Sequence, residues 1–117
     1  MDQSKICKIR DIYRAISEFE TAFAEQFGIC LNEAMVLCAL LERKTMTAGE
    51  LAEALGVTQS NASKIIRMVE DKAFVDRVYG KEDRRQMLFS LTAEGQEKIE
   101  TLKCSDMTLP EVLKNVV

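Results

Sequence analysis

The sequence contains no histidine and one proline, and its five glycines are spread singly along 117 residues. Without histidine there is no Ser-His-Asp triad, no Cys-His pair and no conventional zinc site, and the four cysteines form no CxxC pair. Isolated glycines also exclude a glycine-rich phosphate loop. We therefore expect neither an enzyme nor a protein with a metal or cofactor site.

Long apolar runs are absent too. The longest, Ala34 to Leu41, has 8 residues, whereas a membrane-spanning helix needs about 20. The N-terminus carries Lys5, Lys8 and Arg10 where a signal peptide would have an apolar run. An apolar content of 47% is ordinary for a packed domain. We expect a cytoplasmic protein that forms one domain, residues 1–117, and does not contact a membrane.

A long amphipathic helix is predicted at the N-terminus. Apolar residues recur at three- and four-residue steps from Ile6 to Phe27, and Gly28 is typical of a helix end. In so small a domain part of this apolar stripe has nothing to cover it, so a second subunit is the natural cover. The alternative is that the helix wraps its own domain.

A further helix is predicted at the C-terminus, where Thr108-Leu109-Pro110-Glu111 is typical of a capping box with proline in the first turn. We expect residues 1–28 and 96–117 to be dimerisation helices. The expected dimer interface consists of Ile9, Ile12, Tyr13, Ile16, Phe19, Leu109, Val112 and Leu113.

A helix-turn-helix is predicted over residues 47–69. Thr47-Ala48-Gly49-Glu50 is a capping box, Gly56 permits a left-handed turn, and Thr58 can cap the second helix. After Ala73 the apolar period changes to that of strands. Residues 74–79 and 86–91 predict a β-hairpin with a polar tip. The expected fold class is therefore mainly α with a small β-hairpin.

The outer face of the second helix of this motif is polar and basic, with no acid before Glu70. Such side chains can donate to phosphates or to base edges in the major groove. From Thr58 to Arg85 there are seven bases and five acids, whereas the chain as a whole has a net charge of -3. An acidic body with a locally basic segment favours one orientation on DNA. The alternative is a merely solvated face.

The order of long helix, three short helices, hairpin with Asp83-Arg84-Arg85 and then Leu91-Thr92-Ala93-Glu94-Gly95 resembles the MarR family of bacterial winged-helix transcription regulators. The resemblance covers roughly residues 30–100. It implies a winged helix-turn-helix with N- and C-terminal dimerisation helices, in which residues 31–92 form the DNA-binding lobe. Lys81 and Ala73 depart from the family pattern, which often has proline and glycine there, and the C-terminal tail is shorter than usual.

The resemblance also implies how the protein works. A homodimer would bind a palindromic double-stranded DNA operator, with the recognition helix, residues 58–71, in the major groove and the wing arginine in the minor groove, where the negative potential is strongest. It allows a small-molecule effector. The expected DNA-binding residues are Gln59, Ser60, Asn61, Ser63, Lys64, Arg67, Lys81, Asp83, Arg84 and Arg85.

Two functional hypotheses follow. The first is a dimeric, sequence-specific DNA-binding transcription regulator, in the repressor mode. The alternative is a winged-helix protein-interaction module that no longer binds DNA, which the acidic total charge and the short tail motivate. Redox sensing is disfavoured, because Cys7 adjoins the apolar stripe, Cys38 lies in an apolar run, and cysteine usually behaves as a small buried hydrophobe.

Overall fold

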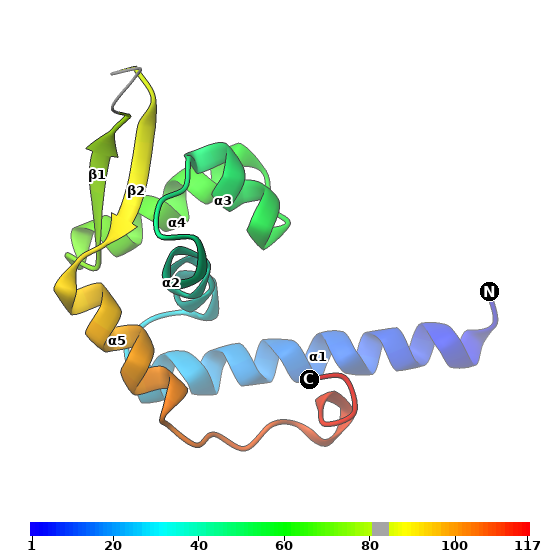
Figure 1. The fold of residues 1–117 in the computed structure, drawn as a ribbon. Helices are drawn as coiled ribbons and strands as arrows, with labels where there is room; N and C mark the ends of the chain where they lie inside the picture. The colour runs from blue at the N-terminus through cyan, green and yellow to red at the C-terminus, as the bar shows by residue number, and fades with distance from the viewer. Residues whose placement is uncertain (81–84) are drawn as a thin grey trace. The chain divides into compact units, whose positions relative to one another are not determined.

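The computed structural model describes residues 1–80 and 85–117. Lys81, Asp83 and Arg84, which the sequence assigns to the tip of the hairpin, lie outside the described residues. The chain divides into two compact units (Figure 1). One consists of Met1–Leu31 and Ser105–Val117, and the other of Asn32–Cys104.

The first unit is built on one long helix, α1 (Gln3–Phe27). Asp2 caps it by accepting a hydrogen bond from the backbone N–H of Lys5 (2.9 Å), and Gly28 ends it with a left-handed φ of 75°. The rings of Phe19, Phe23 and Phe27 follow one another along the helix, with centroids 6.0 Å and 4.8 Å apart. The predicted N-terminal helix and its end at Gly28 are confirmed.

The C-terminal segment of this unit differs from the prediction. A capped helix starting at Thr108 is wrong, because Pro110 precedes a single 3-10 turn, η1 (Glu111–Leu113), and no side chain caps it. Packing decides the local structure instead, since η1 contacts α1 and Leu113 is buried.

The second unit contains four helices and a hairpin (Figure 1). These are α2 (Leu31–Arg43), α3 (Ala48–Leu55), α4 (Gln59–Asp71), β1 (Val75–Tyr79), β2 (Met87–Leu91) and α5 (Ala93–Lys103). The strands pair antiparallel, with Val75 opposite Leu91 and Tyr79 opposite Met87. Leu37, Leu40 and Met46 are fully buried at its core. The expected fold class, mainly α with a small hairpin in a winged helix-turn-helix, is confirmed.

The caps of α3 and α4 form as the sequence predicts. The backbone N–H of Thr47 donates to the Glu50 carboxylate (2.9 Å), and the backbone N–H of Glu50 donates to the Thr47 hydroxyl (3.1 Å). The hydrogen bond from the Thr47 backbone is the main reason why the pKa of Glu50 is lowered. Gly56 ends α3 at a φ of 71°, and the Thr58 hydroxyl accepts from the N–H of Asn61 (3.2 Å). These caps fix where α4 begins.

The joint between α4 and β1 explains why Thr92 and Gly95 occur in the segment Leu91-Thr92-Ala93-Glu94-Gly95. Ala73 turns the chain at a φ of 64°. The Thr92 hydroxyl donates to the carbonyl of Ala73 (2.7 Å) and accepts from the N–H of Gly95 (3.0 Å). A Cβ on Gly95 would lie 2.0 Å from the carbonyl oxygen of Phe74. Glycine is therefore needed for α5 to approach the start of β1.

The helices of the described residues differ in length and in apolar content. No single helix among them is long and apolar enough to cross a membrane, and only α1 and α2 taken together have the length and composition to do so.

Candidate nucleic-acid interface

The polar face of α4 points to solvent. Ala62, Ile65, Ile66 and Val69 are buried, at the steps of three and four residues that keep side chains on one helix face. The helix packs against α3 through this apolar side. The structure thereby brings six of the predicted DNA-binding residues together on the exposed side of one helix: Gln59, Ser60, Asn61, Ser63, Lys64 and Arg67.

Not every base in the basic segment is available to a phosphate. The ammonium of Lys72 donates to both carboxylate oxygens of Glu33 (2.7 Å and 2.9 Å), and Glu33 is only 1% exposed on α2. The guanidinium of Arg77 donates to both carboxylate oxygens of Glu70 (2.7 Å and 3.1 Å). Counting charges along the sequence therefore overestimates the basic surface, and Lys64 and Arg67 remain as the exposed bases of α4.

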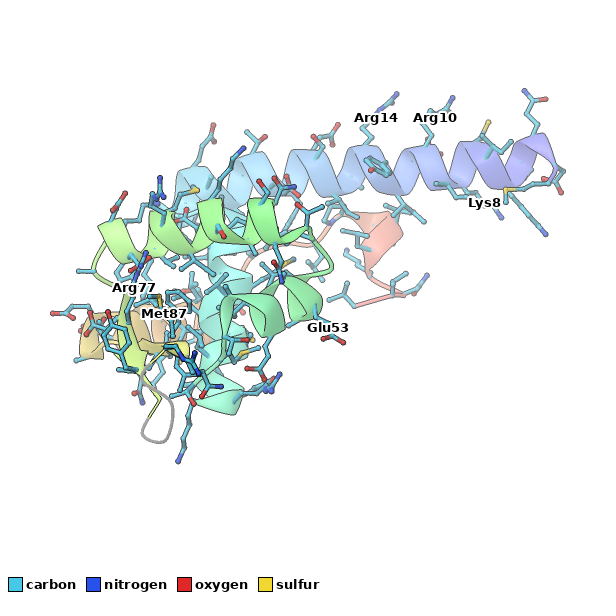
Figure 2. The ribbon with its side chains drawn as sticks, turned by 90° about the horizontal axis from the view of Figure 1, so that it is seen from above. Lys8, Arg10, Arg14, Glu53, Arg77 and Met87 are labelled. Atoms are coloured by element: carbon cyan, nitrogen blue, oxygen red, sulfur yellow. The ribbon has the colours of Figure 1, made fainter. Side chains whose placement is uncertain are left out.

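Arg77 joins α4 to both strands of the hairpin. Besides Glu70, its guanidinium contacts the sulfur of Met87 at 3.5 Å, and Figure 2 shows these two residues close together. The guanidinium also lies over the ring of Phe89, 5.8 Å from the centroid. The hydrogen bond to Glu70 is the main cause that raises the pKa of Arg77. The Arg77 side chain, which β1 carries, is thus held by groups from two further elements, α4 and β2.

A hollow of about 260 Å³ adjoins these groups, between the start of α3, α4 and the hairpin. Its polar lining comes from Ser63, Arg67, Glu70 and Arg77, and Ile66 and Phe89 contribute apolar surface. No group of three or more histidine, cysteine, aspartate or glutamate side chains that could hold a metal ion occurs among the described residues.

The pairing of the two strands of the hairpin continues toward the predicted wing tip. The backbone N–H of Gly80 donates to the carbonyl of Gln86 (2.9 Å), which continues the pairing beyond Tyr79 and Met87. Arg85 follows the tip and is exposed. It is the wing residue whose position the structure gives, since Lys81, Asp83 and Arg84 lie outside the described residues.

The residues expected at a dimer interface form a partly covered apolar surface in the first unit. Ile9, Tyr13 and Ile16 on α1 are 51%, 77% and 38% exposed. Ile12, Phe19 and Leu109 are half-buried, and Val112 is 38% exposed. Leu113 is buried within its own unit.

Two cysteines lie where the sequence does not suggest. The expectation that Cys38 is a buried hydrophobe is wrong, because the turn of α2 places Leu37 and Leu40 in the core and Cys38 on the outside. Cys104 is exposed as well, whereas Cys7 and Cys30 are half-buried. An apolar run shows that a helix is buried but not which of its residues faces out.

The two carboxylates that order this site, Glu33 and Glu70, were not singled out from the sequence. A signal for Glu33 was present, because it shares a helix face with Val36, Leu37 and Leu40. An acid on an apolar face predicts a buried charge that needs a partner. Nothing local in the sequence identifies Lys72, 39 residues away, as that partner.

The chain is similar to known transcription regulators. The family model described as "Sugar-specific transcriptional regulator TrmB" matches residues 23–93. The HTH-type transcriptional regulator PrsX of Escherichia coli is 34% identical over 100 residues, which cover 83% of this chain and 58% of PrsX. PapX of Escherichia coli is 29% identical over 108 residues, 90% of this chain and 66% of PapX. The chain thus spans about 58% to 66% of the length of these relatives.

Solved structures share the fold. The S. aureus MepR–DNA complex aligns with a TM-score of 0.65 at 25% identity and covers 81% of this chain and 78% of that one. A mutant MarR from E. coli complexed with operator DNA aligns with a TM-score of 0.73 at 23% identity, covering 86% of this chain and 76% of that one. The latter likeness shows the fold.

Proposed function

This chain belongs to the TrmB family of transcriptional regulators and has the winged-helix fold of MarR-type regulators, and from this premise we propose that it binds double-stranded DNA as a homodimeric, sequence-specific regulator. The resemblance to MarR-type regulators inferred from the sequence is confirmed. Repression is the proposed mode, and the cytoplasm the proposed location.

The observation that carries the proposal is the outer face of α4. Up to Arg67 its exposed side chains are neutral donors and two bases, and the acids come at the end of the helix, where Glu70 is paired with Arg77 and Asp71 is exposed. A face of this kind does not repel phosphates and can reach base edges. Four apolar residues of the same helix are buried in packing and Met68 is 41% exposed, so that the polar side is left for a partner.

Each group has a proposed task in the complex. Lys64 and Arg67 would bind phosphates or guanine, and the amides of Gln59 and Asn61 suit adenine. Ser60 and Ser63 can donate to phosphates. Arg85 would enter the minor groove beside the recognition helix. For Lys81, Asp83 and Arg84 the proposal rests on the sequence alone.

Dimerisation is assigned to the first unit, on α1 and the segment that follows α5. Ile9, Tyr13 and Ile16 leave an apolar surface that a second copy can cover. Two copies related by a two-fold axis would present two recognition helices, which corresponds to a palindromic operator. Because the chain as a whole is acidic, each copy alone would hold DNA weakly.

A small-molecule effector stays a prediction. The matching family is described as sugar-specific, whereas DNA binding by BpsR of Bordetella bronchiseptica, a protein of similar structure, is regulated by 6-hydroxynicotinic acid. These are different ligand chemistries, so the proposal names no ligand. The relatives are regulators rather than enzymes, and we propose no catalytic activity for this chain.

Selection of bound fragments from genomic DNA by the purified protein tests the proposed function. Enriched fragments should share a palindrome, and affinity for them should fall steeply between low and physiological salt. Sedimentation of the same preparation should show a dimer. Absence of any enriched fragment, together with a stable complex with a different protein, would favour the interaction-module alternative.

A further inference from the structure

We propose that Arg77 is a positioning residue for DNA recognition: its ion pair with Glu70 fixes the wing hairpin relative to the recognition helix and so sets where Arg85 meets the DNA. The inference rests on the proposed DNA binding. It gives Arg77 a role in contacts within the protein, although Arg77 is one of the seven bases that the sequence places between Thr58 and Arg85.

The geometry of the pair supports this assignment. Two parallel hydrogen bonds, 2.7 Å and 3.1 Å long, join the guanidinium to the carboxylate of Glu70. Such a fork fixes the orientation as well as the distance of two groups, which a single contact does not. The Glu70 side chain is 19% exposed and the Arg77 side chain 48%, so the carboxylate is partly shielded from water while the guanidinium is partly screened by it.

The position of Arg77 in the hairpin extends the effect to both strands. Arg77 lies opposite Phe89 in the register of β1 and β2, and its guanidinium lies over that ring. Its third contact, with the sulfur of Met87, is also on β2. β2 begins two residues after Arg85. A shift of the guanidinium would therefore be transmitted to the strand that directly follows the wing arginine.

The chain connection between α4 and the hairpin does not fix their relation alone. It is a turn at Ala73, stabilised by Thr92. Glu70 lies one helical turn before this joint and Arg77 four residues after it. The ion pair connects α4 to β1 at a distance from the turn itself and so holds the angle between the helix and the hairpin. This role of the Glu70–Arg77 pair is called the brace below.

The alternative role for Arg77 is direct contact with a phosphate. The two roles predict opposite effects for Glu70→Gln. If Glu70 is only an acid near DNA, its neutralisation removes a repulsion and raises affinity. If Glu70 holds Arg77 in place, neutralisation loosens the hairpin and lowers affinity, even though the protein becomes less negative.

The test uses full-length Glu70→Gln, Arg77→Gln and Arg77→Lys with a DNA fragment that the wild-type protein selects. Arg43→Gln is the matched control, because Arg43 pairs with Glu50 at a comparable exposure, away from the hairpin. Glu70→Gln and Arg77→Gln should each weaken binding about fivefold. Minor-groove protection from hydroxyl radicals should be lost while major-groove protection persists. The DNA affinity of Arg77→Lys should lie between those of wild type and Arg77→Gln, because an ammonium cannot form two parallel hydrogen bonds to a carboxylate. The control should bind DNA like wild type.

Higher affinity of Glu70→Gln with intact minor-groove protection would overturn the proposal. So would Arg77→Gln that weakens binding while the minor-groove footprint stays unchanged, since that is the behaviour of a phosphate contact. If Arg77→Gln fails to fold by circular dichroism, Glu70→Gln and Arg77→Lys decide the question by the same footprint.

A second measurement separates this proposal from the proposed function. Amide exchange in the free protein should be faster at Gly80, whose N–H closes the hairpin, in Glu70→Gln and Arg77→Gln than in Arg43→Gln. Unchanged exchange would refute the brace. Faster exchange in a protein that selects no DNA would retain the brace and refute the DNA-binding function on which its role was built.

Discussion

Helices α1 and α4 leave opposite kinds of surface exposed. α4 buries four of its apolar residues within its own unit and exposes polar and charged side chains together with Met68. α1 is nearly twice as long and leaves Ile9 and Tyr13 more than half exposed. A helix whose apolar face is mostly buried and whose polar face is exposed suits a hydrated polyanion. A helix with an exposed apolar face suits a second copy of the same helix.

This difference implies that the partner contacts proposed for α4 and for α1 depend on different physical interactions. Binding through α4 should depend on charge and salt, and association through α1 on buried apolar area. Changes in one unit should leave the function of the other largely intact. The following substitutions test this separation.

The largest effect is expected for Gly95→Ala in the second unit. A Cβ there would lie 2.0 Å from the carbonyl oxygen of Phe74, and backbone rather than a flexible side chain would have to move. We expect a loss of about 3 kcal/mol or more in the free energy of unfolding. Denaturant titration measures it. Glu94→Ala, at the exposed neighbouring position, is the control, and equal stability of the two variants would refute the close approach of α5.

The next largest effect is expected for Tyr13→Ser on α1. Tyr13 is 77% exposed, so its removal should scarcely change the stability of the unit by itself. Central aromatic residues at interfaces contribute about 2 kcal/mol, so the dimer dissociation constant should rise about 30-fold. Sedimentation over a concentration series measures it, with the exposed Arg14→Ser as control. A wild-type dimerisation constant in the Tyr13→Ser variant would place the subunit contact elsewhere.

These contrasts show which features could be predicted from sequence. The caps at Thr47 and Thr58, the ends at Gly28 and Gly56 and the hairpin are determined by residues within a few positions of one another, and local pattern predicts them. The outer face of α4 follows from the helical period. The position of the site residues on their elements is therefore accessible from local sequence.

The ion pairs cannot be predicted from local sequence. Glu33 and Lys72 are 39 residues apart, and Glu70 meets Arg77 only because the chain turns back at Ala73. Charge counts cannot distinguish a base that is paired from one that is free. The C-terminal capping box failed for a related reason, because contact of η1 with α1 outweighs a local signal in so short a segment.

A smaller effect is expected for the exposed bases of α4. Lys64→Ala and Arg67→Ala should each weaken DNA binding by about 1 kcal/mol, or about fivefold, and Lys64→Ala should reduce the salt slope by about one. The dimerisation constant should not change, since neither residue belongs to the first unit. Fluorescence anisotropy at several salt concentrations measures both quantities. Lys103→Ala, an exposed base on α5, is the control, and an equal loss in it would mean that only the net charge matters.

The smallest effect concerns how the two helices end. α1 ends at Gly28 with a φ of 75°, and the turn after α4 is at Ala73 with a φ of 64°. Glycine adopts this region without strain, whereas alanine does not. Ala73→Gly should therefore raise the free energy of unfolding by about 0.5 kcal/mol, because relief of strain exceeds the greater chain entropy of glycine in the unfolded state.

Gly28→Ala is the reciprocal change and should lower the free energy of unfolding by about 1 kcal/mol. A Cβ at this position meets no atom within 4 Å, so backbone strain is its main consequence. Denaturant titration of both variants measures the two changes in the free energy of unfolding, which should have opposite signs. Destabilisation by Ala73→Gly would mean that the Ala73 methyl group makes contacts worth more than the strain. The joint between recognition helix and wing would then be held by packing as well as by the hydrogen bond from Thr92.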